Sequence, residues 1–270
     1  MKHTVHALMI AASVSLGIAG SPSDVSAQTL APVPVAPTSP TTFDAPATAD
    51  LTPSLGRIFA DTITDFRRLP SLDSAVILSM GGVTALVGHP SDIRLSQTFS
   101  NSESMRGPFS AGQTIGAATT QLAGAFATYS IGRMIGNPKV ATLGADLVRA
   151  QFVSQAMTQT IKFSVGRTRP DGTSLSFPSG HSASAFATAA VLQRHLGWKA
   201  GIPAYGLAAY VAASRIQVQR HYLSDVAFGA AIGMIAGRTV TIGRGDARFA
   251  VSPAAAPGGA GISFTWVGKK

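Results

Sequence analysis

Apolar residues recur at intervals of three and four along most of the chain between residues 54 and 242. This spacing gathers apolar side chains on one face of a helix and predicts α-helices in preference to strands. The predicted helices cover residues 55–69, 111–136, 138–165, 182–195, 202–215 and 223–237. An apolar stretch over residues 75–88 stops at His89-Pro90, and residues 100–108 are predicted to form a loop. The fold class is therefore an all-α helical bundle.

Both ends of the chain depart from this helical pattern. Residues 28–53 are rich in Pro, Thr and Ala and almost uncharged, which predicts a flexible lead-in. Ser54 is a predicted N-cap, so the helical domain is expected over residues 54–242. Within the tail, residues 243–270, the segments "ARFAVSP" and "GISFTWVG" predict two short strands joined by "AAAPGGA". A C-terminal β-hairpin is the expectation.

The first residues resemble an export signal. Lys2 precedes a modestly apolar run from Ala7 to Ala19, and Val25-Ser26-Ala27 offers the small residues that signal peptidase needs. A membrane anchor is the alternative, but the run is shorter than the ~20 apolar residues of a span. We expect a signal peptide over residues 1–27, cleaved near Ala27, and export to a bacterial periplasm.

Polar residues interrupt the apolar segments of the bundle. Several predicted helices have nearly the length that a membrane span requires. The residues that interrupt them are Gln113, Gln121, Arg133, Gln155, Gln159 and Gln217. This pattern favours a soluble or membrane-peripheral bundle, with an integral membrane protein as the alternative.

Composition narrows the class of partner. Charged residues are 12% of the chain, yet Lys and Arg number 21 against 12 Asp and Glu, which gives a net charge of +9. Such a balance indicates an anionic partner, either a phosphate ester or a membrane surface. Nucleic acid is not expected, because no run of basic residues with interleaved aromatics occurs. The chain has no cysteine, which excludes disulfides and thiolate metal sites.

Two carboxylates fall on one side of the first predicted helix. Asp61 and Asp65 are four residues apart, beside the apolar stripe of residues 55–69. Such a pair could bind a metal ion, but a solvated helix face is the simpler interpretation. No metal ligand is predicted here or elsewhere in the chain.

The first candidate motif, "KFSVGRTRP", carries Lys162, Arg169 and Pro170. Seven residues make about two helical turns, so the two cations would share a face if the helix continues to Thr168. Arg167 lies between them and is expected to point elsewhere. A basic helix C-terminus, stabilised by the macrodipole, is the alternative reading.

The second motif, "PSGH", occupies residues 178–181. Ser179 could simply cap the following helix. The same geometry also directs backbone N–H groups and the positive end of the helix dipole toward an anion. Gly180 would let that anion approach the backbone, and His181 would lie beside it.

The third motif, "SRIQVQRHYLSD", contains Arg215, His221 and Asp225. His221 and Asp225 are four residues apart, so on one helix their side chains can meet. A carboxylate that accepts a hydrogen bond from one imidazole nitrogen fixes the tautomer and frees the other nitrogen for chemistry. An ordinary surface pair is the alternative.

Taken together, the three motifs specify eleven positions in a fixed order. The pattern K-x6-R-P, P-S-G-H and S-R-x5-H-x3-D resembles the signature of the type 2 phosphatidic acid phosphatase superfamily. That superfamily includes bacterial acid phosphatases, lipid phosphate phosphatases and vanadium-dependent haloperoxidases. The resemblance covers about residues 110–240.

The resemblance implies a metal-independent phosphatase that acts on phosphomonoesters or lipid phosphates and diphosphates through a phosphohistidine. It implies that His221 is the nucleophile, that Asp225 orients it, and that His181 protonates the leaving group. Lys162, Arg169, Ser179, Gly180 and Arg215 would then bind the phosphate. No cofactor is expected. The alternatives are a haloperoxidase, in which His221 would bind vanadate, and an integral membrane lipid phosphatase.

Overall fold

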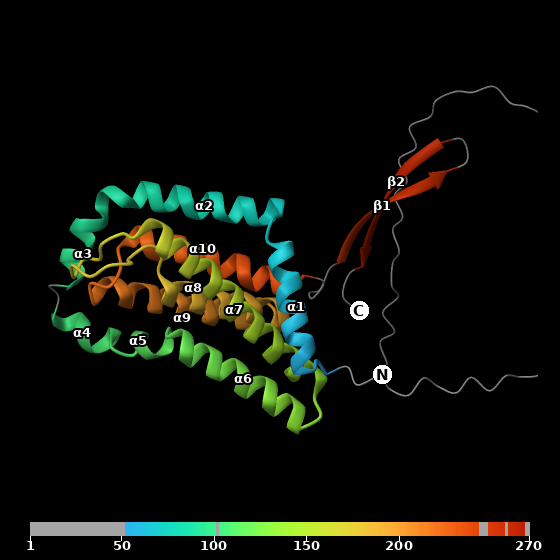
Figure 1. Ribbon diagram of the computed structural model, residues 1–270, viewed down its shortest axis with the longest axis horizontal. Helices are drawn as coiled ribbons and strands as arrows, with labels where there is room; N and C mark the ends of the chain where they lie inside the picture. Colours follow the sequence, from blue (N-terminus) through green and yellow to red (C-terminus); the bar gives the residue numbers. More distant parts are fainter. Residues whose placement is uncertain (1–51, 101–102, 243–247, 257–258, 268–270) are drawn as a thin grey trace, which may run out of the picture. The chain divides into compact units, whose positions relative to one another are not determined.

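The computed structural model describes residues 52–100, 103–242, 248–256 and 259–267 (Figure 1). The predicted signal peptide and all but the last two residues of the predicted lead-in lie outside these residues. The chain divides into two units. Residues 50–244 hold the described helices, and the second unit contains the two strands.

The larger unit is built from helices, as the apolar spacing predicts. The short 3-10 turn η1, His89–Ser91, joins α2 to α3. The α-helices are α1 (Leu55–Arg68), α2 (Leu72–Gly88), α3 (Asp92–Ser100), α4 (Glu103–Phe109), α5 (Gly112–Ile115), α6 (Ala118–Met134), α7 (Pro138–Val165), α8 (Gly180–Leu196), α9 (Trp198–Gln217) and α10 (Leu223–Val240).

The loop predicted over residues 100–108 is wrong, because α4 forms there. The polar sequence of this segment and its Pro108 do not indicate a helix, yet a short helix forms and packs against α9. The Tyr210 hydroxyl donates to the Pro108 carbonyl at 2.6 Å, and the Phe109 and Tyr210 rings stack 5.4 Å apart. Tertiary contacts therefore form a helix that local propensity disfavours.

The single helix predicted over residues 111–136 is also wrong, because the chain forms α5 and α6 with a break between them. At the break, the Gln121 side-chain amide donates to the free carbonyl of Ile115 at 2.8 Å. A Cβ on Gly116 would lie 2.3 Å from Val211 Cγ1, so the backbone at the break contacts α9 directly.

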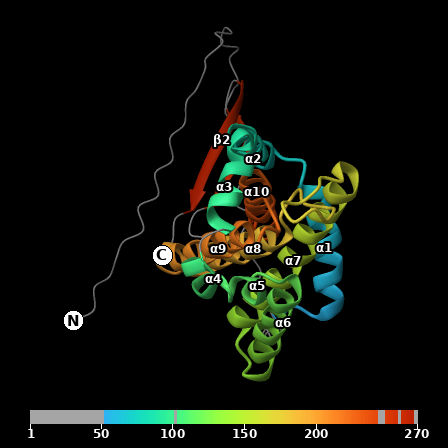
Figure 2. The ribbon, with the colours of Figure 1, turned by 90° about the vertical axis from the view of Figure 1, so that its left-hand side faces the viewer.

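The centre of the bundle is α8, which packs against α7, α9 and α10. Glycines on α10 let this helix approach α8 closely. A Cβ on Gly233 would lie 2.3 Å from the Ala183 carbonyl oxygen. A Cβ on Gly229 would lie 2.5 Å from the Ser179 carbonyl oxygen. The start of α10 is thereby held against the start of α8. In the end-on view, α2 and α3 lie on one side of this core and α6 on the other (Figure 2).

Asp65 is not on a solvated face, so the expectation for the pair in α1 is wrong at this position. Its carboxylate is fully buried and accepts from Arg149 Nε at 2.8 Å and Arg149 Nη2 at 2.6 Å. Arg149 also donates to Asp146, which lies 2.8 Å from His195 Nε2. Asp61 stays at the surface, 3.9 Å from Arg57. The buried network joins α1 to α7 and α8.

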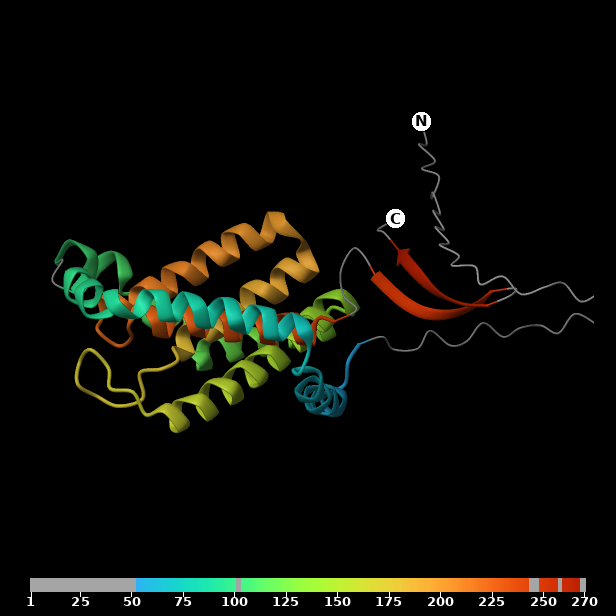
Figure 3. The same cartoon turned by 90° about the horizontal axis from the view of Figure 1, so that it is seen from above.

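Within the described part of the chain, two helical segments are long and apolar enough to cross a membrane, residues 72–100 and Leu223–Val240. The second is 67% buried inside the bundle, as a core helix would be, whereas the first is only 11% buried. Within the first, Leu72, Met80, Leu86 and Val87 are between 67% and 81% exposed. The helix α2, which lies over the other helices in the view from above (Figure 3), therefore presents apolar side chains on its outer face.

The second unit contains the hairpin that the tail sequence predicts. Strand β1 (Arg248–Ala256) pairs antiparallel with β2 (Gly259–Val267), from Arg248 opposite Val267 to Ala256 opposite Gly259. The strands run further toward the turn than the sequence pattern indicates.

Candidate active site

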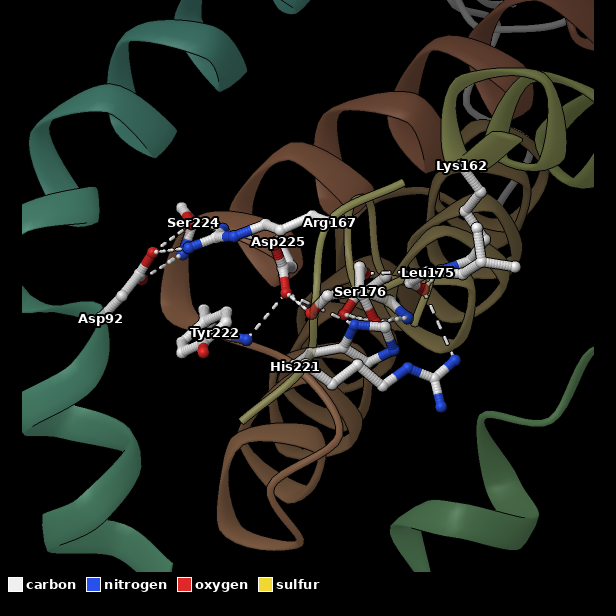
Figure 4. Close-up of polar contacts among 12 residues, drawn as sticks. Asp92, Lys162, Arg167, Leu175, Ser176, His221, Tyr222, Ser224 and Asp225 are labelled. Atoms are coloured by element: carbon white, nitrogen blue, oxygen red, sulfur yellow. Dashed lines mark hydrogen bonds and ion pairs between the residues drawn. The ribbon is translucent and has the colours of Figure 1, made fainter. Parts of the chain in front are cut away.

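The three sequence motifs meet at one end of the bundle. They lie at the end of α7, at the start of α8, and in the turn from α9 to α10. Figure 4 shows Lys162, Ser176, His221 and Asp225 converging there from different segments.

Lys162 and Arg169 do not share a helix face, contrary to the sequence prediction. The helix α7 ends at Val165, and Gly166 turns the chain with a left-handed φ of 62° that favours glycine. Arg169 therefore lies in the following loop. The two cations meet at the Leu175 carbonyl, which is 2.8 Å from Lys162 Nζ and 3.5 Å from Arg169 Nη2.

Ser179 caps α8, so the capping alternative describes its side chain. The buried Ser179 hydroxyl oxygen faces the Ser182 N–H at 3.4 Å and accepts from the Ser182 hydroxyl at 3.2 Å. Its own N–H donates to the Asp225 carbonyl at 3.0 Å, which ties the second motif to the third. A Cβ on Gly180 would approach other atoms no closer than 3.6 Å, so packing alone does not demand glycine there.

His221 and Asp225 do meet, but not along one helix. His221 precedes α10, and its N–H donates to the Arg215 carbonyl at 3.1 Å. Asp225 lies in the first turn of α10, and its Oδ2 is 3.6 Å from His221 Nδ1. The same oxygen accepts from the Tyr222 N–H at 2.9 Å and from the Ser176 hydroxyl. The carboxylate therefore faces the imidazole across a helix N-terminus.

Arg167 points toward this carboxylate, although it was expected to point away from the site. Its Nη1 is 2.7 Å from Asp225 Oδ1, and its Nη2 is 2.9 Å from Asp92 Oδ2 (Figure 4). The guanidinium lies over the Tyr222 ring, 4.2 Å from its centroid. Sequence reasoning missed Arg167, Ser176 and Asp92. Only Arg167 had a signal, since it lies inside the first motif.

Several buried polar atoms in this region have no protein partner among the described residues. They are His181 Nε2, Arg169 Nε and Arg215 Nε; His221 Nδ1 makes no hydrogen bond either, but it faces Asp225 Oδ2 at 3.6 Å. Because an unsatisfied buried donor costs about 1–3 kcal/mol, such a cluster is typical of a site that receives a ligand. Two guanidinium donors in the group indicate an anion.

The same burial and charge set the protonation of the site. Burial, followed by the charges of Arg215 and of the neighbouring His221, lowers the pKa of His181 to about 4. Burial also lowers the pKa of His221 to about 4, with Lys162 and Arg215 adding to the effect and Asp225 opposing it. Both rings are therefore neutral at pH 7.

The cations and the carboxylate respond to the same forces. Burial, then Arg169, lowers the pKa of Lys162 to about 8, and burial lowers the pKa of Arg215 to about 10. Burial would raise the pKa of Asp225, but contacts with His221, Ser176, the Tyr222 N–H and Arg167 hold it below its ordinary value. The site therefore pairs an ionised carboxylate and neutral imidazoles with an excess of cations.

Residues 143–248 match the PAP2 superfamily, and this segment contains all eight residues predicted for the site. The match covers less than half of the chain, so this part of the chain is similar to that superfamily. Among curated proteins, the chain is 46% identical to lipid A 1-phosphatase of Porphyromonas gingivalis over 87 residues. These residues cover 30% of this chain and 19% of that protein. The chain is also 37% identical to decaprenylphosphoryl-5-phosphoribose phosphatase of Mycobacterium tuberculosis over 108 residues. These residues cover 36% of this chain and 59% of that protein.

Two solved structures match part of the chain at low similarity. LpxE of Aquifex aeolicus is 21% identical with a TM-score of 0.48, covering 56% of this chain and 94% of that one. The transmembrane PAP2-type phosphatidylglycerolphosphate phosphatase of Bacillus subtilis is 19% identical with a TM-score of 0.46, covering 68% and 92%. The chain spans less than two thirds of the curated relatives that it matches.

We expect the pKa of Lys162 to control the alkaline limit of anion binding. Above about pH 8 the lysine loses its charge, so the affinity for inorganic phosphate should fall as the pH rises through this value. In Lys162→Arg the charge persists, and the fall should move to higher pH even if overall affinity changes. Calorimetric titration with phosphate on either side of pH 8 measures this shift.

The matched control is Lys199→Arg, because Lys199 is exposed on α9. Its pH dependence should equal that of the wild type. An unchanged pH dependence in Lys162→Arg would show that Lys162 does not contact the anion.

Proposed function

We propose that the protein is a metal-independent phosphatase that hydrolyses lipid phosphates or diphosphates through a phosphohistidine at His221. One observation carries this proposal: the unpaired Nε donors of Arg169 and Arg215 and the unpaired Nε2 of His181 are buried in the region where His221 faces Asp225. Three cations around one anion supply the charge that a metal ion provides in other phosphatases.

The first step transfers the phosphoryl group to the protein. His221 is neutral, so a ring nitrogen can attack phosphorus while the bond from phosphorus to the leaving oxygen breaks. Lys162, Arg169 and Arg215 stabilise the charge that spreads over the three equatorial oxygens. Asp225 stabilises the positive charge that develops on the imidazole, because it lies 3.6 Å from Nδ1.

His181 supplies the proton that the leaving oxygen takes up. Its pKa is about 4, and a bound phosphate dianion would raise that value by opposing the nearby cations. In the second step the neutral ring accepts a proton from water, and the water oxygen attacks phosphorus. The bond to His221 breaks, and inorganic phosphate leaves.

A lipid substrate is supported by the apolar outer face of α2 and by the names of the relatives. The curated relatives act on lipid A and on decaprenylphosphoryl-5-phosphoribose, both of which carry long apolar chains. A helix with side chains up to 81% exposed can lie against or within a lipid bilayer, which favours the membrane-associated alternative. Export through a cleaved signal peptide stays a prediction.

The substrate class can be tested by removing the lipid chains. We expect kcat/KM for phosphatidate in detergent micelles to exceed that for glycerol 3-phosphate by at least about tenfold, because the chains add binding energy. Phosphate release from both esters is the measurement. Equal values would contradict a lipid substrate and leave a phosphatase for soluble monoesters.

The roles of the histidines can be separated by the quality of the leaving group. We expect His221→Ala to abolish turnover of every ester, because the nucleophile is lost. His181→Ala should retain more activity on nitrophenyl phosphate than on phosphatidate, since nitrophenolate leaves with little help from an acid; general acid catalysis contributes about 10²–10⁴-fold. Steady-state rates with EDTA present measure both effects and test metal independence.

The control is His195→Ala, because His195 lies in the buried network with Asp146, outside the site. It should lower stability and leave the ratio of the two activities unchanged. Full activity of His221→Ala, or equal losses for both esters in His181→Ala, would refute the corresponding assignment, and inhibition by EDTA would refute the metal-free mechanism.

A further inference from the structure

The short helix α5 contacts two groups of the site, although it lies outside the three motifs and outside the segment that matches the superfamily. We propose that Gln113 on α5 is a positioning residue that sets the orientation of Arg215 and His181 for phosphoryl transfer. The inference rests on the proposed function, and it assigns a role to a residue that the sequence pattern treats only as a polar interruption.

The side chain of Gln113 holds Arg215. Its Oε1 accepts from Arg215 Nη1 at 2.6 Å, and the guanidinium is almost completely buried. One edge of the guanidinium is thereby fixed, while Arg215 Nε stays without a protein partner among the described residues. Because the five N–H donors of arginine are held in one plane, fixing one of them orients all the others.

The backbone of Gln113 holds His181. The backbone of Gln113 acts on the His181 ring and raises its pKa, against the stronger effects of burial and of Arg215. The other ring nitrogen, Nε2, is buried and has no partner within the described part of the chain. A hydrogen bond at one nitrogen defines the tautomer and directs the second nitrogen to the ligand.

Close contacts with α9 hold α5 in this position. A Cβ on Gly112 would lie 2.2 Å from Ser214 Oγ, and Ser214 is the residue before Arg215. A Cβ on Gly116 would lie 2.3 Å from Val211 Cγ1 and 3.3 Å from His181 Cβ. Glycines on both sides of the turn let its backbone reach α9 and the start of α8 together.

A neutral amide suits this position for an electrostatic reason. Gln113 Oε1 satisfies one donor of Arg215 without cancelling its charge, so the full positive charge remains available to the phosphate. A carboxylate at the same distance would form an ion pair with Arg215. It would also favour the protonated form of His181, whose pKa Arg215 now lowers.

The test compares Gln113→Glu with Gln113→Leu, which removes the acceptor at similar volume. We expect Gln113→Glu to weaken binding of inorganic phosphate by roughly tenfold or more, on the scale of a hydrogen bond to a charged group. Gln113→Leu should lower kcat/KM by roughly tenfold while phosphate affinity falls less. The alkaline limb of the pH–rate profile should move to higher pH in Gln113→Glu only, because the pKa of His181 rises.

The matched controls are Gln159→Glu and Gln159→Leu, because Gln159 is exposed on α7. Both should behave as the wild type in affinity and in pH profile. Thermal unfolding of each variant shows whether it is folded, and phosphate titration of the folded fraction gives the affinity without turnover.

The outcomes separate this inference from the proposed function. If phosphate affinity and the pH profile of Gln113→Glu equal those of the wild type, Gln113 is not a positioning residue, whatever its effect on stability. If the wild type binds phosphate and hydrolyses no ester, the proposed function fails. A loss of affinity in Gln113→Glu would then still support the role of Gln113 at the anion site.

Discussion

The site depends on the hydrogen bonds that the buried carboxylate of Asp225 accepts. It accepts from Arg167, from the Ser176 hydroxyl and from the Tyr222 N–H, and it lies 3.6 Å from His221 Nδ1. The backbone carbonyl of Asp225 accepts a hydrogen bond from the Ser179 N–H. An ionised carboxylate is expensive to bury without such partners. The side-chain partners come from the loop between α7 and α8 and from the turn before α10, and the backbone carbonyl adds the start of α8, so the contacts of this one residue bring the three motifs together.

The charge of the site follows from this arrangement. Arg167 and Asp225 neutralise each other, and Asp92 binds Arg167 from the other side. Lys162, Arg169 and Arg215 have no carboxylate within ion-pair distance among the described residues, which leaves an excess of positive charge beside His221. That excess, added to burial, keeps both histidines neutral, and a bound phosphate would complete the balance. The superfamily match and the geometry therefore agree on an anion site, and the phosphatase reaction follows as our proposal.

The sequence predicts the helical class well, because apolar spacing is a local pattern. The apolar spacing predicts α7 at its observed bounds, and Ser54 caps α1 as expected, whereas the cap at Ser179 is the alternative reading. Contacts over long sequence distances could not be read in this way. Asp92 reaches Arg167 from 75 residues away, Gln113 reaches Arg215 from 102, and Asp65 reaches Arg149 from 84. The left-handed turn at Gly166 redirected Arg167 and Arg169, which a continuous helix would have placed otherwise.

The central claim is that His221 and the three cations surround one tetrahedral anion. A crystal structure with orthovanadate tests it most directly, because vanadate adopts the geometry of phosphoryl transfer. We expect vanadium within bonding distance of a His221 ring nitrogen, its equatorial oxygens bound by Lys162, Arg169 and Arg215, and its outer apical oxygen beside His181 Nε2. Vanadate bound elsewhere, or held by the cations without contact to His221, would contradict the account.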